Sequence, residues 1–400
     1  MRESDSPPSI HAFGRVRLEP DPRLAELRRA GPVTRVRLPD GSSGWLATGW
    51  DEARRVLADP VFSRARAVGR TPGAHRRETF LIDMDPPDHG RVRRLAVPAF
   101  THRRVQALAP QVDALAGALV DAMIDAGPPA DLVRDLALPL PITVIGELLG
   151  VPAQDRDRFQ GWSDAFLSTT AFSSGEIAAA HVHLDDYLTE LIAKRRIEPS
   201  DDLLSELVRA RDEDGGLSEA ELVNLGVGLL VAGYETTANQ ITNLVYTLLT
   251  QRSLWDRLVA EPSLLATAVD ELLRYVPLGT ETGMPRVAVR DVELGGVLVR
   301  AGDVVYAGRP AANRDPSVFD NPERIVLDRS NNPHLAFGHG IHHCLGAHLA
   351  RLELRAALGA LTARLPAVRI AVPGTDLQWK AGLSVRGLRA LPLTWEDDTR

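Results

Sequence analysis

The longest uninterrupted helical pattern in this chain of 400 residues runs from Ser218 to about Thr250. It opens with Ser218-Glu219-Ala220-Glu221, a capping box in which the serine and the second glutamate each satisfy a backbone amide of the first turn. No proline interrupts the segment, so we expect a helix of roughly 33 residues, about 50 Å long at 1.5 Å per residue. A helix of that length has to cross most of the domain that contains it.

The rest of the chain is also mainly helical in pattern. Apolar residues three and four apart recur in 106–127, 175–196 and 264–276, and a shorter helix is expected at 51–59. Alternating segments typical of strands are 33–38, 44–48, 286–289, 297–300 and 304–307. Helices and strands alternate too irregularly for a doubly wound parallel sheet. The predicted fold class is therefore mainly α with a small β part (α+β), in a single domain over residues 1–400.

Composition and charge exclude several classes of protein. Hydrophobic residues make up 44% of the chain and charged residues 25%, as in ordinary globular proteins. The net charge is -7, so no general basic surface is available to bind nucleic acid. Of the 46 basic residues, only Lys194 and Lys380 are lysines. The single cysteine, Cys344, cannot form an internal disulfide, which removes the usual sign of a secreted, stapled domain.

The sequence also argues against export and membrane insertion. Its first residues carry charges and prolines where a signal peptide needs an apolar stretch. Of the two most apolar stretches, 136–151 contains two prolines and 222–233 is too short, because a membrane-spanning helix needs about 20 apolar residues. We therefore expect a cytoplasmic protein without a membrane contact.

The most informative motif is a glycine-rich loop around the cysteine, Phe337-Gly338-His339-Gly340-Ile341-His342-His343-Cys344-Leu345-Gly346, which precedes a helix expected from His348. A thiolate close to a helix start is stabilised by the helix dipole and by free amides, so Cys344 suits a metal. The glycines let the backbone approach a flat group. A lone cysteine is more often a small buried apolar residue. The surrounding frame favours a thiolate ligand of haem iron instead.

Two other kinds of site could be built on this loop, a zinc site and the active site of a cysteine hydrolase. A zinc site would draw on the local histidines and Cys344, but structural zinc sites usually combine two pairs of ligands separated by a loop, and the chain has no second cysteine. A cysteine hydrolase needs a base and an orienting residue, which no pattern here indicates. The sequence therefore favours neither a zinc site nor a cysteine hydrolase.

The frame Phe-x-x-Gly-x-x-x-Cys-x-Gly resembles the haem-binding loop of the cytochrome P450 enzymes, in particular their soluble bacterial branch. The resemblance implies the P450 fold, with the long helix over the haem, and haem b (iron protoporphyrin IX) as the cofactor. It implies that Cys344 is the axial iron ligand, that His342 contacts a haem propionate, and that Phe337 and Gly338 belong to the cofactor-binding loop.

A second motif lies inside the long helix, at Ala232-Gly233-Tyr234-Glu235-Thr236-Thr237. A glycine within a helix costs up to about 1 kcal/mol relative to alanine, and a threonine hydroxyl can bond back to the preceding turn, so a local distortion is expected here. The segment is similar to the oxygen-binding segment of the P450 family. That resemblance implies that Glu235 and Thr236 are catalytic and relay protons through water to bound dioxygen, and that Ala232 borders the haem.

Further matches are weak individually but follow the order of the family's motifs. Glu271 and Arg274 can pair on one helix face, and they resemble the family's Glu-x-x-Arg motif. The resemblance implies that Arg324 completes a buried structural cluster with them. His89 and Arg93 lie one helical turn apart and can grip one anion. The resemblance makes that anion a haem propionate and adds Arg286 as a further propionate ligand, because buried carboxylates need several positive partners.

The function that the resemblance implies is that of a haem-thiolate monooxygenase. It would insert one oxygen atom from O2 into a hydrophobic small molecule, by hydroxylation or epoxidation, and would tailor a secondary metabolite such as a polyketide, terpenoid or peptide. Two alternatives stay open: a P450 that catalyses oxidative coupling or another non-hydroxylating oxidation, and a non-catalytic haem-thiolate sensor. The sensor would have no need of Glu235 and Thr236.

Electrons have to come from another protein. No Gly-x-Gly-x-x-Gly motif follows a strand, so the chain has no sign of its own nicotinamide or flavin site. The resemblance implies a ferredoxin or flavodoxin donor with its reductase. Such donors are usually acidic, and a basic docking face near Cys344 is expected from Arg91, Arg94, Arg103, Arg104 and Arg351.

Overall fold

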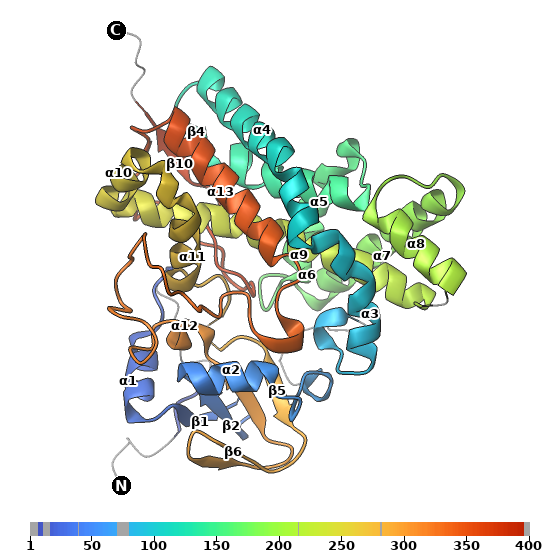
Figure 1. Ribbon diagram of the computed structural model, residues 1–400, viewed down its shortest axis with the longest axis vertical. Helices are drawn as coiled ribbons and strands as arrows, with labels where there is room; N and C mark the ends of the chain where they lie inside the picture. Colours follow the sequence, from blue (N-terminus) through green and yellow to red (C-terminus); the bar gives the residue numbers. More distant parts are fainter. Residues whose placement is uncertain are drawn as a thin grey trace. The chain divides into compact units, whose positions relative to one another are not determined.

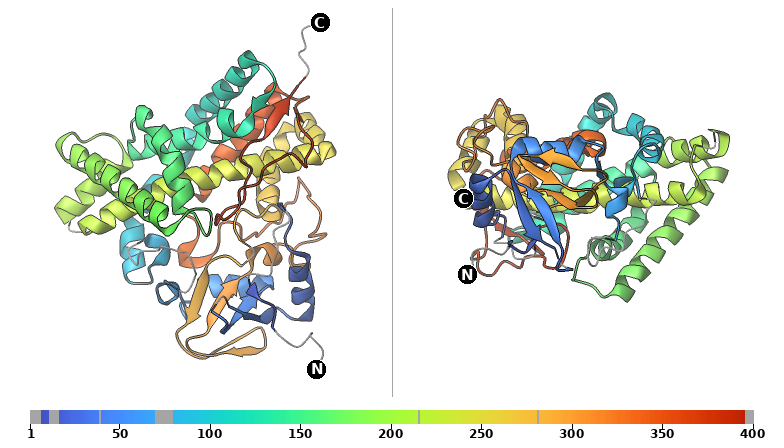
Figure 2. Two further views of the ribbon diagram at one scale, coloured as in Figure 1. Left: turned by 180° about the vertical axis from the view of Figure 1, so that it is seen from behind. Right: turned by 90° about the horizontal axis from the view of Figure 1, so that it is seen from below.

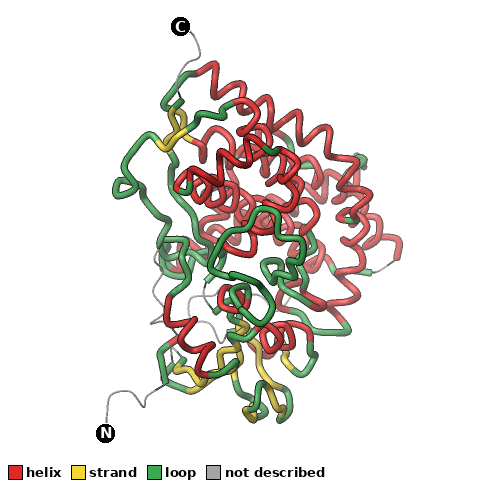
Figure 3. The backbone as a smooth tube through the Cα atoms, turned by 60° about the vertical axis from the view of Figure 1, so that its left-hand side comes forward, coloured by secondary structure: helices red, strands yellow, loops and turns green. Residues whose placement is uncertain are grey.

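The computed structural model describes residues 7–10, 17–38, 40–69, 80–214, 216–280 and 282–395. Two compact units can be distinguished: the first comprises 1–78, 82–86 and 270–344, and the second comprises 79–81, 87–269 and 345–400. Helices dominate the described residues and strands are short (Figure 3), as the predicted fold class requires. The single domain over residues 1–400 stays a prediction.

The first unit is built on a five-stranded sheet in the order β1-β2-β8-β5-β3. Its strands are β1 (Val33–Arg37), β2 (Ser43–Ala47), β3 (Phe62–Ser63), β5 (Pro285–Ala288) and β8 (Val304–Ala307). The predicted hairpin at 33–48 is confirmed, since β1 and β2 pair antiparallel. β2 and β8 pair in parallel, which joins the N-terminal part of the chain to residues 285–307 (Figure 2, blue and orange strands).

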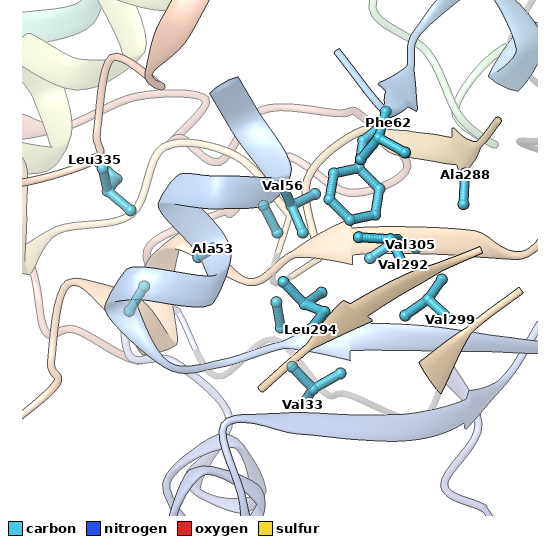
Figure 4. Close-up of a cluster of buried hydrophobic side chains, with 14 residues drawn as sticks. Val33, Ala53, Val56, Phe62, Ala288, Val292, Leu294, Val299, Val305 and Leu335 are labelled. Carbon is cyan, nitrogen blue, oxygen red and sulfur yellow. The ribbon is translucent and has the colours of Figure 1, made fainter. Parts of the chain in front are cut away.

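A small hairpin and three helices complete the first unit. The hairpin consists of β6 (Val292–Leu294), which the sequence analysis missed, and β7 (Val297–Val299). The helices are α1 (Pro22–Ala30), α2 (Trp50–Ala58) and α12 (Arg309–Ala312). Ala53 and Val56 on α2 face Val305 and the hairpin residues Val292 and Leu294, and this forms one apolar core (Figure 4).

The second unit is almost entirely helical. Its helices are α3 (Asp88–Ala96), α4 (His102–Ala126), α5 (Pro139–Leu149), α6 (Phe159–Phe166), α7 (Ser174–Ile197), α8 (Leu203–Asp214), α9 (Glu219–Thr250), α10 (Arg252–Ala260) and α13 (Ala347–Arg364). α11 (Leu265–Tyr275) links the two units along the chain. α4 and α13 lie side by side (Figure 1). A minor sheet in the order β4-β10-β9 joins β4 (Ala130–Asp131), β9 (Arg369–Ile370) and β10 (Pro392–Thr394).

Short helical segments connect these elements. They are η3 (Ala65–Ala67), η4 (Leu81–Asp83), η5 (Val97–Phe100), the π-helical η6 (Val133–Ala137), η7 (Ala153–Arg158), η8 (Pro262–Leu264) and η9 (Gly340–His342). The last of them lies inside the predicted cysteine loop.

The predicted long helix is confirmed as α9. Ser218 is its N-cap, and both halves of the capping box form: the backbone N–H of Ser218 donates to Glu221 over 2.7 Å, and that of Glu221 donates to the Ser218 hydroxyl over 3.2 Å. Most of its side chains are buried. α9 therefore forms the interior helix of the second unit.

α4 is long and apolar enough to cross a membrane by length and composition alone. The helix expected at 106–127 is thus a further apolar segment beside 136–151 and 222–233. A single helix of this kind is weak evidence for a span, because a core helix of a soluble protein passes the same test. Val105, Val112 and Val120 of α4 are buried, while 28% of its most apolar window is buried as a whole.

The C-terminal hairpin, residues 378–389, lies against the segment that follows α6. Its two arms are joined by backbone bonds, including that from Lys380 N to Gly387 O at 2.8 Å. At its tip, the Gly382 carbonyl accepts three backbone N–H groups from residues 169–171. Gly382 has a φ of +70°, and a Cβ there would lie 2.6 Å from the nitrogen of Ala171, so only glycine fits.

Candidate functional site

The cysteine loop has an open, glycine-shaped backbone. Gly338 and Gly340 have φ values of +74° and +72°, which favour glycine. The Cys344 N–H donates to the carbonyl of Phe337 over 2.9 Å, so the loop folds back on itself while the thiol stays exposed. α13 begins at Ala347, one residue earlier than expected, with Gly346 as its N-cap. The thiol therefore lies just ahead of a helix start, as predicted.

Helix α2 and a buried asparagine hold this loop in place. A Cβ on Gly340 would lie 2.6 Å from the Cα of Ala58 and 2.9 Å from the carbonyl oxygen of Leu57. The side chain of Asn313 accepts the backbone N–H of Leu335 over 2.7 Å, just before the loop begins. These contacts hold the loop backbone in place.

Two arginines of the first unit place positive charge near the loop. Arg286 is 5% exposed; it donates to the carbonyl of Phe62 over 3.2 Å, and no carboxylate among the described residues forms an ion pair with it. Burial, with Arg64 and Arg309 close by, lowers the pKa of Arg286 to about 10, although the charge of Asp85 opposes the shift. Arg309 donates to the carbonyl of Ala336 over 3.2 Å. Burial lowers its pKa and the charge of Cys344 opposes that shift.

Sequence reasoning missed Arg309, since no motif marks it. It predicted Arg286, and it also predicted His342, which is half-buried in the same unit. A buried cation without a carboxylate partner is costly unless an anion from elsewhere balances it. This part of the first unit is therefore suited to an anionic group.

Glu271 and Arg274 form the buried ion pair that the sequence predicts. Two bonds of 2.8 Å join them, and both side chains are 0% exposed. The prediction that Arg324 completes the cluster with its charge is wrong. Its side chain is exposed, and only its carbonyl accepts from Arg274, over 3.0 Å. Arg329, whose side chain is 8% exposed, donates to Glu271 over 2.9 Å in its place.

In the second unit, α3 carries both members of the predicted anion-binding pair. His89 is 2% exposed and Arg93 is half-buried, one turn further along the same helix. Their spacing of four residues places both side chains on one face of α3.

α9 opens on one face at the predicted oxygen-binding segment. Ala232 is exposed and Thr236 half-buried, although most of the helix is buried. The Thr236 hydroxyl donates to the carbonyl of Ala232 over 2.6 Å, which confirms the expected back-bond. The segment is helical throughout. Gly233 makes room for α5, since a Cβ there would lie 2.8 Å from Ile145.

Glu235 is buried and paired with a lysine that sequence reasoning did not connect to it. Its carboxylate is 0% exposed, and Lys380 of the C-terminal hairpin contacts it at 2.5 Å. Asn239 donates to the same oxygen over 2.7 Å. Burial raises the pKa of Glu235, while Lys380 lowers it. The rarity of lysine in the chain was the one available signal.

The expected basic face of the second unit is smaller than predicted. Arg91 forms an ion pair with Glu221, and Arg104 pairs with Glu206 at 3.3 Å, so their charges are partly neutralised. Arg94 and Arg103 are exposed. These two are the arginines best placed to meet an acidic partner.

Comparison with known proteins identifies the family. A family model described as Cytochrome P450 matches residues 28–365. The chain is 49% identical to mycinamicin IV hydroxylase/epoxidase of Micromonospora griseorubida, over 93% of this chain and 95% of that protein. The chain belongs to the cytochrome P450 family. It is also 48% identical to nocardicin C N-oxygenase of Nocardia uniformis subsp. tsuyamanensis, over 95% and 96% of the two chains.

Solved structures confirm the predicted P450 fold. The LnmA cytochrome P450 hydroxylase of the leinamycin biosynthetic pathway of Streptomyces atroolivaceus matches with a TM-score of 0.90 and 49% identity, over 96% of this chain and 98% of that one. This P450 is a monooxygenase, and its family uses a haem-thiolate cofactor, O2, an organic substrate and a redox partner.

The residues of this P450 fit a haem. The thiol of Cys344, in a glycine-rich loop just ahead of a helix start, suits an iron ligand. The buried charge of Arg286, which lacks a carboxylate partner among the described residues, suits a propionate.

Proposed function

We propose that this P450 inserts one oxygen atom from O2 into a hydrophobic small molecule, by hydroxylation or epoxidation, as a tailoring step in secondary metabolism. The observation that carries the proposal is the open face of α9, where Thr236 stands beside the buried acid Glu235. A sensor would have no use for this pair. The relatives named as a hydroxylase/epoxidase and an N-oxygenase support the reaction class.

Haem b would be held by Cys344 on iron and by Arg286, His342, His89 and Arg93 at its propionates. Phe337, Gly338 and Ala232 would also belong to its binding site. When bound, it supplies the one-electron and O2 chemistry that protein side chains lack. Two propionates need several cations, which these residues provide.

Thr236 and Glu235 would handle protons. The hydroxyl proton of Thr236 is engaged with the Ala232 carbonyl, so its oxygen presents lone pairs to the open face and can accept a hydrogen bond from water. A water held there would pass a proton that Glu235 supplies. Burial favours the protonated form of Glu235, which is the form that can donate.

Thr236→Ala should uncouple oxygen consumption from product formation. A positioned proton-transfer group contributes about 100-fold or more, so product per O2 consumed should fall steeply and hydrogen peroxide should rise. The measurement compares product, peroxide and O2 uptake. Thr250→Ala is the control, because it removes the same kind of back-bond, to the Tyr246 carbonyl at 2.8 Å, outside the open face. Equal coupling in Thr236→Ala and Thr250→Ala would contradict the proposed role.

The substrate is proposed to be a polyketide, terpenoid or peptide, in line with the named antibiotic-pathway relatives. Titration of purified protein with representatives of the three classes, read out as a change in haem spin state, tests this choice. We also propose a cytoplasmic location, which agrees with a chain whose single cysteine forms no internal disulfide.

The electron donor is proposed to be a ferredoxin or flavodoxin. Arg94→Glu combined with Arg103→Glu should slow reduction by about 10-fold or more at low ionic strength, because steering by opposite charge raises association rates. Stopped-flow reduction kinetics measure the effect, which should shrink at high salt. Arg29→Glu with Arg37→Glu, two exposed positions of the first unit, changes the net charge equally and serves as the control. Equal rates in both double variants would remove the docking proposal.

A further inference from the structure

A buried lysine is unusual in this chain. Only two of its 46 basic residues are lysines. Lys194 is exposed on α7, whereas the side chain of Lys380 is only 10% exposed. Lysine is among the residues least often buried unless it is paired. Lys380 therefore has a specific partner inside the second unit.

That partner is Glu235, and a second carboxylate stands close by. The Lys380 ammonium lies 2.5 Å from Oε1 of Glu235 and 3.5 Å from Oδ1 of Asp164 on α6. The side chain of Asp164 is 25% exposed, while that of Glu235 is 0% exposed. One ammonium is thus shared between a deeply buried carboxylate and one nearer to solvent.

The C-terminal hairpin holds Lys380 in this position. Gly387 lies against Asn239, since a Cβ there would lie 1.9 Å from the side-chain oxygen of that residue. Asn243 donates to the carbonyl of Arg386 over 3.0 Å. Two asparagines one turn apart on α9 therefore seat the arm of the hairpin that pairs with Lys380.

The hydrogen bonds of Glu235 distinguish its two oxygens. Oε1 accepts from Lys380 and from Asn239, while Oε2 is buried and has no hydrogen-bond partner among the described residues. A proton bound to Oε1 would compete with two donors, so the proton of the neutral acid belongs on Oε2. The carboxyl group is therefore held by one oxygen and carries its proton on the other.

We propose that Lys380 is a positioning residue of the proton relay: it fixes Glu235 by Oε1 and, in opposition to Asp164, sets the pH at which Oε2 gains and loses its proton. The inference rests on the proposed role of Glu235. It extends that role to two residues outside the family motif, one on α6 and one on the C-terminal hairpin.

The charges around Glu235 act in opposite directions. Burial is the largest influence and raises the pKa of Glu235; Lys380 lowers it and Asp164 raises it. Asn239, on α9 itself, adds an uncharged donor that lowers it. His181 on α7 and Glu353 on α13 are buried ionisable residues of other helices that pack against α9. Lys380 contacts the carboxylate of Glu235, and Asp164 contacts Lys380.

The test titrates Glu235 directly. Infrared difference spectroscopy of the holoenzyme, with Glu235→Gln as the reference, follows the protonated carboxyl as the pH is varied. Lys380→Met should move the midpoint upward by about one to three pH units, because an opposite charge at this distance lowers a carboxyl pKa by that amount. Asp164→Asn should move the midpoint downward. Lys380→Arg keeps the charge and should leave the midpoint near that of the parent.

Opposite shifts from the two charge-removing variants would support the proposal, since a merely structural role predicts no such reversal. An unchanged midpoint in Lys380→Met, or an upward shift in Asp164→Asn, would overturn it. Asp164→Asn and Lys380→Arg keep the test decisive if Lys380→Met does not fold. A second measurement, the amount of product formed per O2 consumed, tests the role of Glu235 separately from that of Lys380. Normal coupling of O2 uptake to product in Glu235→Gln would remove the proposed role of Glu235, whatever the titration midpoints show.

Discussion

Cys344→His should abolish the long-wavelength Soret band of the reduced, carbon-monoxide-bound enzyme. That band requires a thiolate on iron, and no second cysteine exists to replace this one. Loss of a residue that only hydrogen-bonds to a metal ligand typically costs about 10- to 100-fold in activity. Turnover should fall by more than this, because Cys344→His replaces the proposed ligand itself. The absorption spectrum and product formation measure the two effects.

His343→Gln is the matched control, because it changes the neighbouring exposed residue of the same loop without touching the thiol. It should keep the thiolate spectrum. If Cys344→His kept that spectrum as well, sulfur at this position would not be the ligand. The proposed oxidation chemistry would then lose its basis.

Glu271→Gln should lower the free energy of unfolding by about 3 to 5 kcal/mol, the usual cost of breaking a buried ion pair by removing one partner. Glu271 faces two guanidinium groups, those of Arg274 and Arg329, and its side chain is 0% exposed. Neutralising the carboxylate leaves both positive charges without their shared partner. Urea denaturation of the variant and the parent measures the difference.

Asp256→Asn supplies the comparison for a solvent-exposed pair. Asp256 and Arg252 lie 2.7 Å apart, but their side chains are 56% and 41% exposed, so the loss should stay below about 1 kcal/mol. If Glu271→Gln and Asp256→Asn lowered the free energy of unfolding by a similar amount, the buried ion pair of Glu271 would contribute no more to stability than an exposed pair.

Several features of this protein follow from short stretches of sequence. The capping box marks the start of α9, because each of its bonds joins residues three apart. The back-bond of Thr236 to Ala232 is equally local, and so is the ion pair of Glu271 with Arg274. The cysteine loop is recognisable because its glycines are required by its own backbone. In each case the interacting groups are neighbours along the chain.

Other features depend on residues that only the folded chain brings together. Lys380 contacts Glu235, which lies 145 positions earlier in the chain. Arg329 contacts Glu271, which lies 58 positions earlier, in the place expected for Arg324. Arg309, the first residue of α12, reaches the carbonyl of Ala336 just ahead of the cysteine loop. The spacing of these residues along the chain does not predict such contacts. The amino-acid sequence by itself determined the long helix, the glycine-rich backbone of the cysteine loop and the family. The tertiary structure alone decided which distant charges meet, because a buried charge requires a partner and packing selects which side chain provides it.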